Sequence, residues 1–101
     1  MTIPFACDMT AIPPDLRAVH QRLIRRLMTD AGEKVQELPD GFAFGFPHDE
    51  YDALTEFVGR ERLCCPFLTF IMEVAPDHGP LLLRMTGPEG AKEFIRAELR
   101  L

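Results

Sequence analysis

The chain has 101 residues, of which 47% are hydrophobic and 27% are charged. These values are typical of one soluble globular domain that packs its own core, and they exclude a disordered or fibrous protein. The acidic residues number 16 and the basic residues 11, which gives a formal net charge of -5. An acidic chain has little general affinity for phosphate backbones or anionic lipid surfaces, so we expect no nucleic-acid partner and no membrane association.

The beginning of the sequence gives no sign of export. Residues 1–8 contain neither a basic segment nor an apolar run of the kind that signal peptides carry. No apolar run elsewhere approaches the roughly 20 residues of a transmembrane helix. The three cysteines, two of them adjacent, do not form the even and spaced set of a secreted disulfide framework. We therefore expect a cytoplasmic protein with reduced thiols.

The first half of the chain predicts a helix followed by a hairpin. Apolar residues recur at spacings of three and four over 16–28, which indicates an amphipathic helix that ends near Asp30. A short strand over 35–38 follows, then a Pro-Asp-Gly turn, then a strand over 42–46 whose phenylalanines alternate with small residues.

The second half predicts the same order of elements again. A helix has an acidic start at Asp49, runs to residue 63 or 64 and is closed by Pro66, because the residue before a proline is pushed out of the helical region. Strands over 67–74 and 81–85 flank a second turn that contains proline, aspartate and glycine.

A third helix over 87–100 completes the predicted fold, with a capping pattern in the segment Thr86-Gly87-Pro88-Glu89. The order αββαββα predicts an α+β fold with two layers, in which a four-stranded antiparallel sheet carries the helices on one face. We expect a single domain over 1–101 that consists of two αββ-like units, at about 13–47 and 48–86, and the C-terminal helix.

The most unusual part of the sequence is the end of the second predicted helix. Helical spacing places Glu61 in the middle of the apolar stripe, with Cys64 and Cys65 three and four residues further along the same face. A carboxylate that points toward a core needs a partner, so Glu61 is expected to pair with a cation, bind a metal or lie at the edge of a pocket. The structural alternative for both cysteines is burial as small hydrophobic residues.

Three residues outside this segment are candidates to join it. In the first predicted helix, His20 lies on the inward stripe and Arg17 at its border, so helices that pack side by side would bring both toward Glu61. Cys7, in the extended N-terminal segment, is a candidate third sulfur. The structural alternatives are a hydrogen-bonded core histidine, an Arg17–Glu61 ion pair and a cysteine without a ligand role.

Adjacent thiolates at the end of a helix select soft ions, which makes mercury(II), copper(I), arsenic(III) and zinc the candidate ions. The absence of any Cys-x-x-Cys spacing argues against a zinc ribbon or finger and favours mercury, copper(I) or arsenic. The predicted metal ligands are Cys64 and Cys65, completed by Cys7 and His20, with Glu61 and Arg17 supporting the ligands from behind.

Two other interpretations stay open. A thiol redox switch would use Cys64 and Cys65, although the dipole at a helix C-terminus opposes a thiolate and a disulfide between adjacent residues is strained. A non-catalytic interaction or oligomerisation module would keep its cysteines in the core. The sequence contains no Gly-x-Ser-x-Gly, His-Glu-x-x-His, P-loop or dinucleotide-binding motif. The metal hypothesis therefore describes a carrier, buffer or detoxifying sink and not an enzyme.

The segment Glu61-Arg62-Leu63-Cys64-Cys65-Pro66-Phe67, with Phe70 after it, resembles a family of small, largely uncharacterised bacterial proteins that carry a Glu-Arg-x-Cys-Cys-Pro-Phe motif. The resemblance extends to Thr86-Gly87-Pro88-Glu89-Gly90, to Ala6-Cys7-Asp8 and to the Arg17-x-x-His20 step, and so spans nearly the whole chain. It implies no particular activity. It does imply that the six residues named above as ligands and supporting groups belong to one site. A carrier also needs a protein partner that delivers or receives the ion, and the sequence leaves open whether the chain forms a homodimer.

Overall fold

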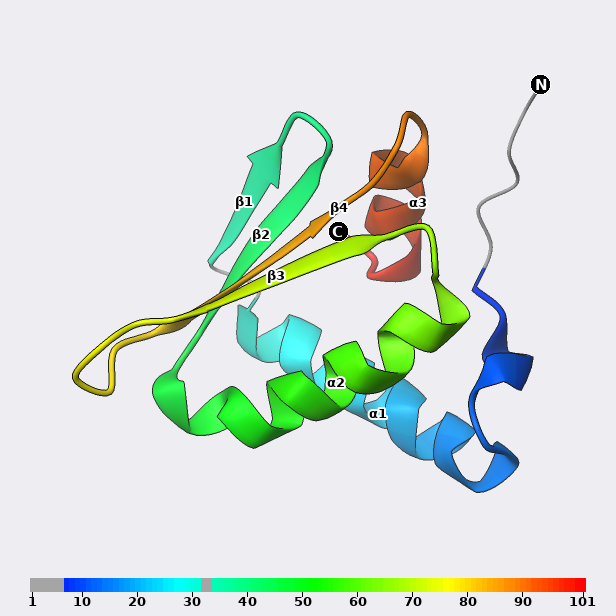
Figure 1. Ribbon diagram of the computed structural model, residues 1–101, viewed down its shortest axis with the longest axis horizontal. Coiled ribbons are helices and arrows are strands. Elements are labelled where there is room, and N and C mark those ends of the chain that lie inside the picture. Colours follow the sequence, from blue (N-terminus) through cyan, green and yellow to red (C-terminus); the bar gives the residue numbers. More distant parts are fainter. Residues whose placement is uncertain (1–6, 32–33) are drawn as a thin grey trace.

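The structure, a computed structural model, describes residues 7–31 and 34–101 (Figure 1). Short 3₁₀ helices, η1 (Met9–Ala11) and η2 (His48–Glu50), precede the first two α-helices. The other elements, in chain order, are α1 (Pro14–Ala31), β1 (Val35–Leu38), β2 (Gly41–Phe46), α2 (Tyr51–Cys64), β3 (Thr69–Val74), β4 (Leu81–Thr86) and α3 (Ala91–Glu98). The predicted α+β class and the order αββαββα are confirmed.

The four strands form one antiparallel sheet in the order β1-β2-β4-β3. Phe44 of β2 and Met72 of β3 both lie opposite Leu83 of β4. Because side chains alternate along a strand, the three phenylalanines of β2 share one face with the apolar residues of β4. That face forms the core, and its fully or nearly fully buried members are Phe42, Phe44, Phe46, Leu81, Leu83 and Met85.

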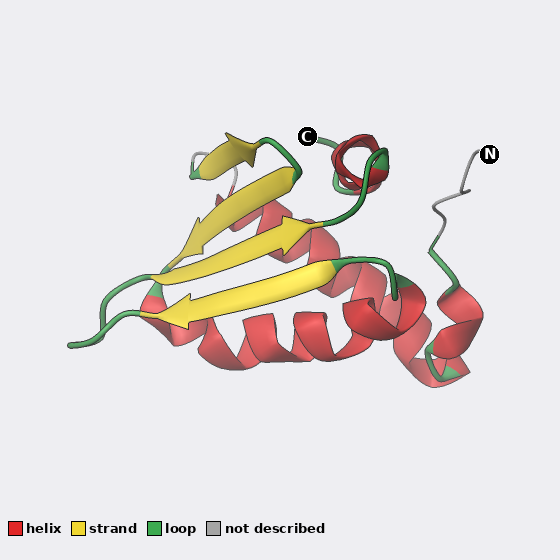
Figure 2. Ribbon diagram, turned by 45° about the horizontal axis from the view of Figure 1, so that its top comes forward, coloured by secondary structure: helices red, strands yellow, loops and turns green. Residues whose placement is uncertain are grey.

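The helices cover this buried face, and Figure 2 shows α1 and α2 as a second layer beneath the sheet. α1 contributes Leu27 to the core, α2 contributes Phe57 and α3 contributes Ile95. The opposite face of the sheet carries Arg84 and Glu73, which form an ion pair at 2.6 Å across neighbouring strands. In the described part of the chain, no helix is long and apolar enough to cross a membrane.

The inward stripes of α1 and α2 follow the predicted periodicity. His20 and Glu61 are both fully buried, whereas residues of α1 outside the apolar stripe are exposed, namely Ala18, Gln21, Arg22 and Arg25. α1 and α2 lie side by side, as Figures 1 and 2 show. This packing brings two buried polar residues from different helices together beneath the sheet.

The start of α3 differs from the prediction. Thr86 is the last residue of β4, where it pairs with Gly41 and Thr69, so it does not begin a helix. α3 begins only at Ala91, after Gly90 in the left-handed region at φ 94°, and no side chain caps it. The predicted helix cap at Thr86 was therefore wrong. The backbone of Thr86 belongs to the sheet, and a residue that left the ladder early would lose those hydrogen bonds.

Candidate metal centre

The last turn of α2 carries three groups of the candidate centre. Glu61 and Cys64 are buried within the helix, and Cys65, also buried, is the residue at which the helix ends. The N–H of Cys65 donates to the carbonyl oxygen of Glu61 at 2.8 Å, and Pro66 then prevents a further turn. The Sγ of Cys65 lies 3.3 Å from Oε1 of Glu61. The end of one helix thus brings a carboxylate and two thiols to the same buried place.

Cys7 reaches this place from the N-terminal segment. The N–H of Asp8 donates at 2.8 Å to the carbonyl oxygen of Cys64, one of the carbonyls that the end of a helix leaves without an intrahelical partner. The Sγ of Cys7 consequently lies 2.9 Å from the Sγ of Cys64 and 3.2 Å from the Sγ of Cys65. Unlike the other two cysteines, Cys7 is only half-buried.

Arg17 holds the segment that follows Cys7. Its Nε donates to the carbonyl oxygens of Met9 and Ile12, at 2.9 and 3.0 Å. These bonds attach η1 to the beginning of α1. Glu61 has His20 as its ion-pair partner, so the structure places Arg17 beside the N-terminal segment and not at the Glu61 carboxylate.

Four residues offer a compact set of ligand atoms. One atom each from Cys7, Glu61, Cys64 and Cys65 lies within 4.8 Å of all the others. The Sγ atoms of Cys64 and Cys65 are 3.8 Å apart, which equals the roughly 3.8 Å expected between two sulfurs that share a tetrahedral zinc ion with bonds of about 2.3 Å. The two distances from Cys7 are shorter, so an ion placed between the sulfurs would move Cys7 outward.

His20 lies behind Glu61 and outside this set of four. Its Nε2 is 2.7 Å from Oε2 of Glu61, with both side chains fully buried, and its ring stacks on that of Phe57 with the centroids 5.9 Å apart. The Nε–H of Arg60 donates to Nδ1 of His20 at 3.1 Å. Because Nδ1 accepts this bond, the imidazole proton is on Nε2 and is donated to Glu61. Arg60 and His20 together fix which way the Glu61 carboxylate faces.

The charge of His20 depends on Arg60. Burial lowers the pKa of His20, whereas hydrogen bonding to Cys64 and Glu61 raises it, and the net result is a pKa of about 9. A second proton on Nδ1 would face the Nε–H of Arg60. The charge of His20 and the hydrogen bond from Arg60 are therefore linked, because a protonated Nδ1 cannot accept that bond.

The three thiols differ in acidity because they share hydrogen bonds. Bonds from Cys65 and Cys7, and a further one from His20, hold the pKa of Cys64 well below its usual range. The hydrogen bond to Cys64 raises the pKa of Cys7. Hydrogen bonds to Cys64 and Cys7, together with burial, raise the pKa of Cys65. Without an ion, the cluster thus holds its negative charge on Cys64 and protons on the other two sulfurs.

Glu98 of α3 is a further carboxyl at the centre, and the sequence analysis missed it. Both of its carboxyl oxygens lie 3.9 Å from the Sγ of Cys65. Burial, followed by hydrogen bonding to Glu61, raises the pKa of Glu98 to about 8. Helical spacing puts Glu98 three residues after Ile95 on the buried stripe of α3, the same signal that singled out Glu61.

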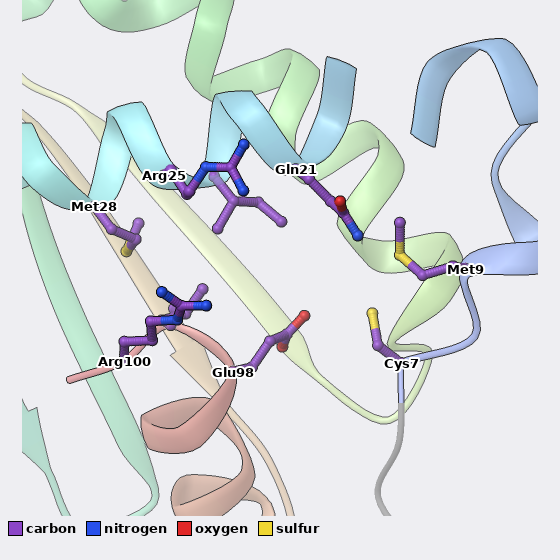
Figure 3. Close-up of a pocket in the computed structure, with 9 residues that line it drawn as sticks. Cys7, Met9, Gln21, Arg25, Met28, Glu98 and Arg100 are labelled. Atoms are coloured by element: carbon purple, nitrogen blue, oxygen red, sulfur yellow. The ribbon is translucent and has the colours of Figure 1, made fainter. Parts of the chain in front are cut away.

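A cavity of about 350 Å³ opens beside Cys7 (Figure 3). Cys7 and Glu98 lie on its inner side, whereas Arg25 and Arg100 reach into it from α1 and from the end of the chain. The cavity connects the buried sulfurs to the surface through Cys7.

The balance of charges in the centre favours a cation. Three thiols and two carboxyls meet here, and the Arg60 guanidinium contacts the group through His20. Ionisation of the remaining thiols would crowd further anions into this buried place, where they repel one another unless a positive charge lies between them. A metal ion bound by the thiolates and by Glu61 would supply that charge.

No family model matches the chain, and neither a curated protein nor a solved structure matches it.

Proposed function

We propose that this protein binds a thiophilic metal or metalloid ion through Cys7, Cys64, Cys65 and Glu61, and that it acts as a cytoplasmic carrier, buffer or detoxifying sink for that ion. The observation that supports the proposal is the set of three sulfurs and one carboxylate oxygen within 4.8 Å of one another. His20, expected from the sequence as a ligand, here supports Glu61 through the 2.7 Å hydrogen bond.

Zinc is the ion that this ligand set fits best. Four ligands complete a tetrahedral zinc site, and zinc accepts both thiolate and carboxylate. Mercury(II), copper(I) and arsenic(III) are softer and prefer sulfur alone, so they make no use of Glu61. The carboxylate is therefore the feature that favours zinc over the three softer ions.

A role in ion transfer or storage follows from the open side of the centre. Structural zinc sites are closed by their ligands. Here Cys64 and Cys65 are fully buried, but Cys7 is half-buried at the edge of a cavity. An ion at this position is held firmly from one side and is reachable from the other.

Native mass spectrometry tests this proposal. The protein, purified without oxygen or chelators, is exposed in turn to zinc, copper(I), mercury(II) and arsenite with excess glutathione present. We expect one zinc ion to be retained, and the Cys64→Ser, Cys65→Ser double variant to lose it. Leu63→Ser is the matched control, because Leu63 is 42% exposed on the same turn of α2. An ion-free mass under every condition would contradict the proposal, and retention of a softer ion alone would reassign the ion.

A thiol redox switch is the second candidate, and one distance favours a particular form of it. The shortest Sγ–Sγ distance is 2.9 Å between Cys7 and Cys64, against 3.8 Å between the adjacent cysteines. Peroxide would oxidise these two thiols to a disulfide and be reduced to water, and a dithiol would reverse the change. Peptide mapping after peroxide treatment should then find a Cys7–Cys64 bond, and finding none would remove this candidate.

A further inference from the structure

The cavity beside Cys7 carries charges that the proposed ion does not need. Arg25 of α1 and Arg100 at the end of the chain both line it, and Figure 3 shows their side chains across the cavity from Cys7. Among the side chains that the structure describes, in residues 7–29 and 34–101, neither guanidinium has a carboxylate partner. Unpaired arginines at a cavity are suited to bind carboxylates, because the guanidinium presents its donors in a planar fork.

The rest of the lining is polar on one side and apolar on the other. Glu98 and Gln21 face the cavity, and Met9 and other apolar side chains complete its wall. The volume of about 350 Å³ lies at the lower end of the range for small-molecule sites. Two cations, one carboxyl and a thiol in such a space match a small molecule with carboxylates, an ammonium group and a sulfur.

The turn that follows α3 places Arg100 at this cavity. Arg100 follows α3 in the left-handed region at φ 57°, and the N–H of Leu101 closes the turn on the carbonyl oxygen of Arg96 at 2.9 Å. This position after a helix is most often glycine, because a side chain is disfavoured there. An arginine in place of glycine puts its guanidinium at the cavity at the expense of backbone conformation.

We propose that this cavity binds a small zwitterionic thiol, an amino acid or short peptide that carries carboxylates, an ammonium group and a thiol, and that its sulfur exchanges with Cys7 on the bound ion. The inference rests on the proposed function, since it needs an ion at the centre. Arg25 and Arg100 hold the carboxylates of the thiol, and a carboxyl oxygen of Glu98 accepts a hydrogen bond from its ammonium group.

The exchange step balances without any oxidation or reduction. The bond between the ion and the Cys7 sulfur breaks as a bond between the ion and the incoming sulfur forms, and the proton of the incoming thiol passes to Cys7. The ion keeps its charge, and Cys64, Cys65 and Glu61 keep their bonds to it. Cys7 is the ligand that leaves, because it is the half-buried sulfur at the cavity. The reverse step delivers an ion to the protein.

Transfer kinetics of the zinc-loaded full-length protein test this inference. A coloured chelator receives the zinc, and its rate of colour formation is measured with glutathione, with uncharged 2-mercaptoethanol and with no thiol. We expect glutathione to accelerate transfer at least about tenfold more than 2-mercaptoethanol, because charged hydrogen bonds of this kind are worth about one order of magnitude or more each. S-methylglutathione, which keeps the charges but has no thiol, should inhibit the glutathione reaction.

Two variants and one control separate binding from folding. Arg25→Gln and Arg100→Gly should each reduce the glutathione acceleration about tenfold and leave the acceleration by 2-mercaptoethanol unchanged. Because glycine suits the left-handed turn, Arg100→Gly should fold at least as stably as the parent protein, as its melting temperature will show. Arg22→Gln, an exposed change on the same helix, should have no effect.

The outcomes distinguish the two proposals. If the parent protein retains none of the tested ions, the proposed function is wrong and this inference falls with it. If zinc is retained but glutathione and 2-mercaptoethanol act equally, or the two arginine variants behave like the parent protein, the thiol site is wrong and the metal site stands.

Discussion

Compared with the end of α2, which contributes Glu61, Cys64 and Cys65 from five consecutive positions, the N-terminal segment contributes Cys7 alone. The three groups of α2 are fully buried and their spacing is fixed by helical backbone. Cys7 comes from 57 residues away, is half-buried, and is positioned by the hydrogen bond from Asp8 to Cys64 and by the bonds from Arg17 to the residues that follow. One side of the centre is thus buried at the end of a helix, and the other is half-buried beside a cavity.

This difference suggests a division of labour between affinity and exchange. Ligands that are held in place before the ion arrives lose little entropy on binding, so they contribute most of the affinity. A half-buried ligand beside a cavity can leave and return while the others keep the ion. The predictions below test whether the two sides of the centre differ in this way, beginning with the largest expected effect.

Removal of a buried thiolate should cause the greatest loss. Zinc sites with four protein ligands bind with about 10–16 kcal/mol, so the loss of one rigid ligand should cost about a quarter of that, or roughly a hundredfold to a thousandfold in Kd. We expect this for Cys65→Ser, measured by competition with a chelator of known affinity. Leu63→Ser should bind like the parent protein, and a Cys65→Ser variant with unchanged affinity would mean that the ion is held elsewhere.

The apparent affinity for zinc should rise with pH. The pKa values of Cys7 and Cys65 are raised and that of Cys64 is lowered, so two thiol protons must leave when the ion binds near neutral pH. Protons then compete with the ion, and its affinity should increase about a hundredfold per pH unit and fall by the same factor as pH decreases. In Cys7→Ser the dependence should drop to about tenfold per unit. A flat profile would contradict a thiolate site.

Removal of Cys7 should cost less than removal of a buried cysteine. Because the Cys7 position opens on a cavity, water or the new serine hydroxyl can take its place on the ion, and we expect Cys7→Ser to lower affinity about tenfold to a hundredfold. Stopped-flow transfer to a chelator should show most of this change in the dissociation rate. Equal losses for Cys7→Ser and Cys65→Ser would remove the distinction between the two sides.

The smallest effect is expected at His20, which contacts no ion in this arrangement. His20→Phe keeps a ring on Phe57 and removes the donor to Glu61, and loss of such a supporting hydrogen bond should weaken binding about tenfold. A Glu61→Gln, His20→Phe double variant should bind no worse than Glu61→Gln alone, since both changes act through one carboxylate. Additive losses would show that His20 is itself a ligand.

The periodicity of the sequence was sufficient to predict the fold and the rigid side of the centre. The apolar stripes placed His20 and Glu61 inward, and spacing put both cysteines of α2 on the face of Glu61. Such contacts within one helix follow from 3.6 residues per turn. The cap expected at Thr86 failed because pairing with the neighbouring strands decides where β4 ends.

Contacts between distant elements were the part that periodicity could not specify. Whether His20 or Glu61 lies nearer to the sulfurs depends on how α1 is rotated against α2. No local sequence pattern specifies that rotation. The position of Cys7 depends on contacts between distant segments, among them the hydrogen bond from Asp8 to the end of α2 and the bonds from Arg17 to η1 and Ile12. Glu98 carried the same inward-stripe signal as Glu61, but only the packing of α3 brings it to within 3.9 Å of Cys65.

X-ray absorption spectroscopy at the zinc edge of the zinc-loaded protein is the decisive measurement for a centre of three sulfurs and one carboxylate. We expect three sulfur neighbours at about 2.3 Å and one oxygen at about 2.0–2.2 Å. In Cys7→Ser we expect two sulfur neighbours of the zinc, with oxygen or nitrogen atoms in the other positions. A first shell of nitrogen and oxygen atoms alone, or a sulfur count that does not change in Cys7→Ser, would contradict the proposed centre.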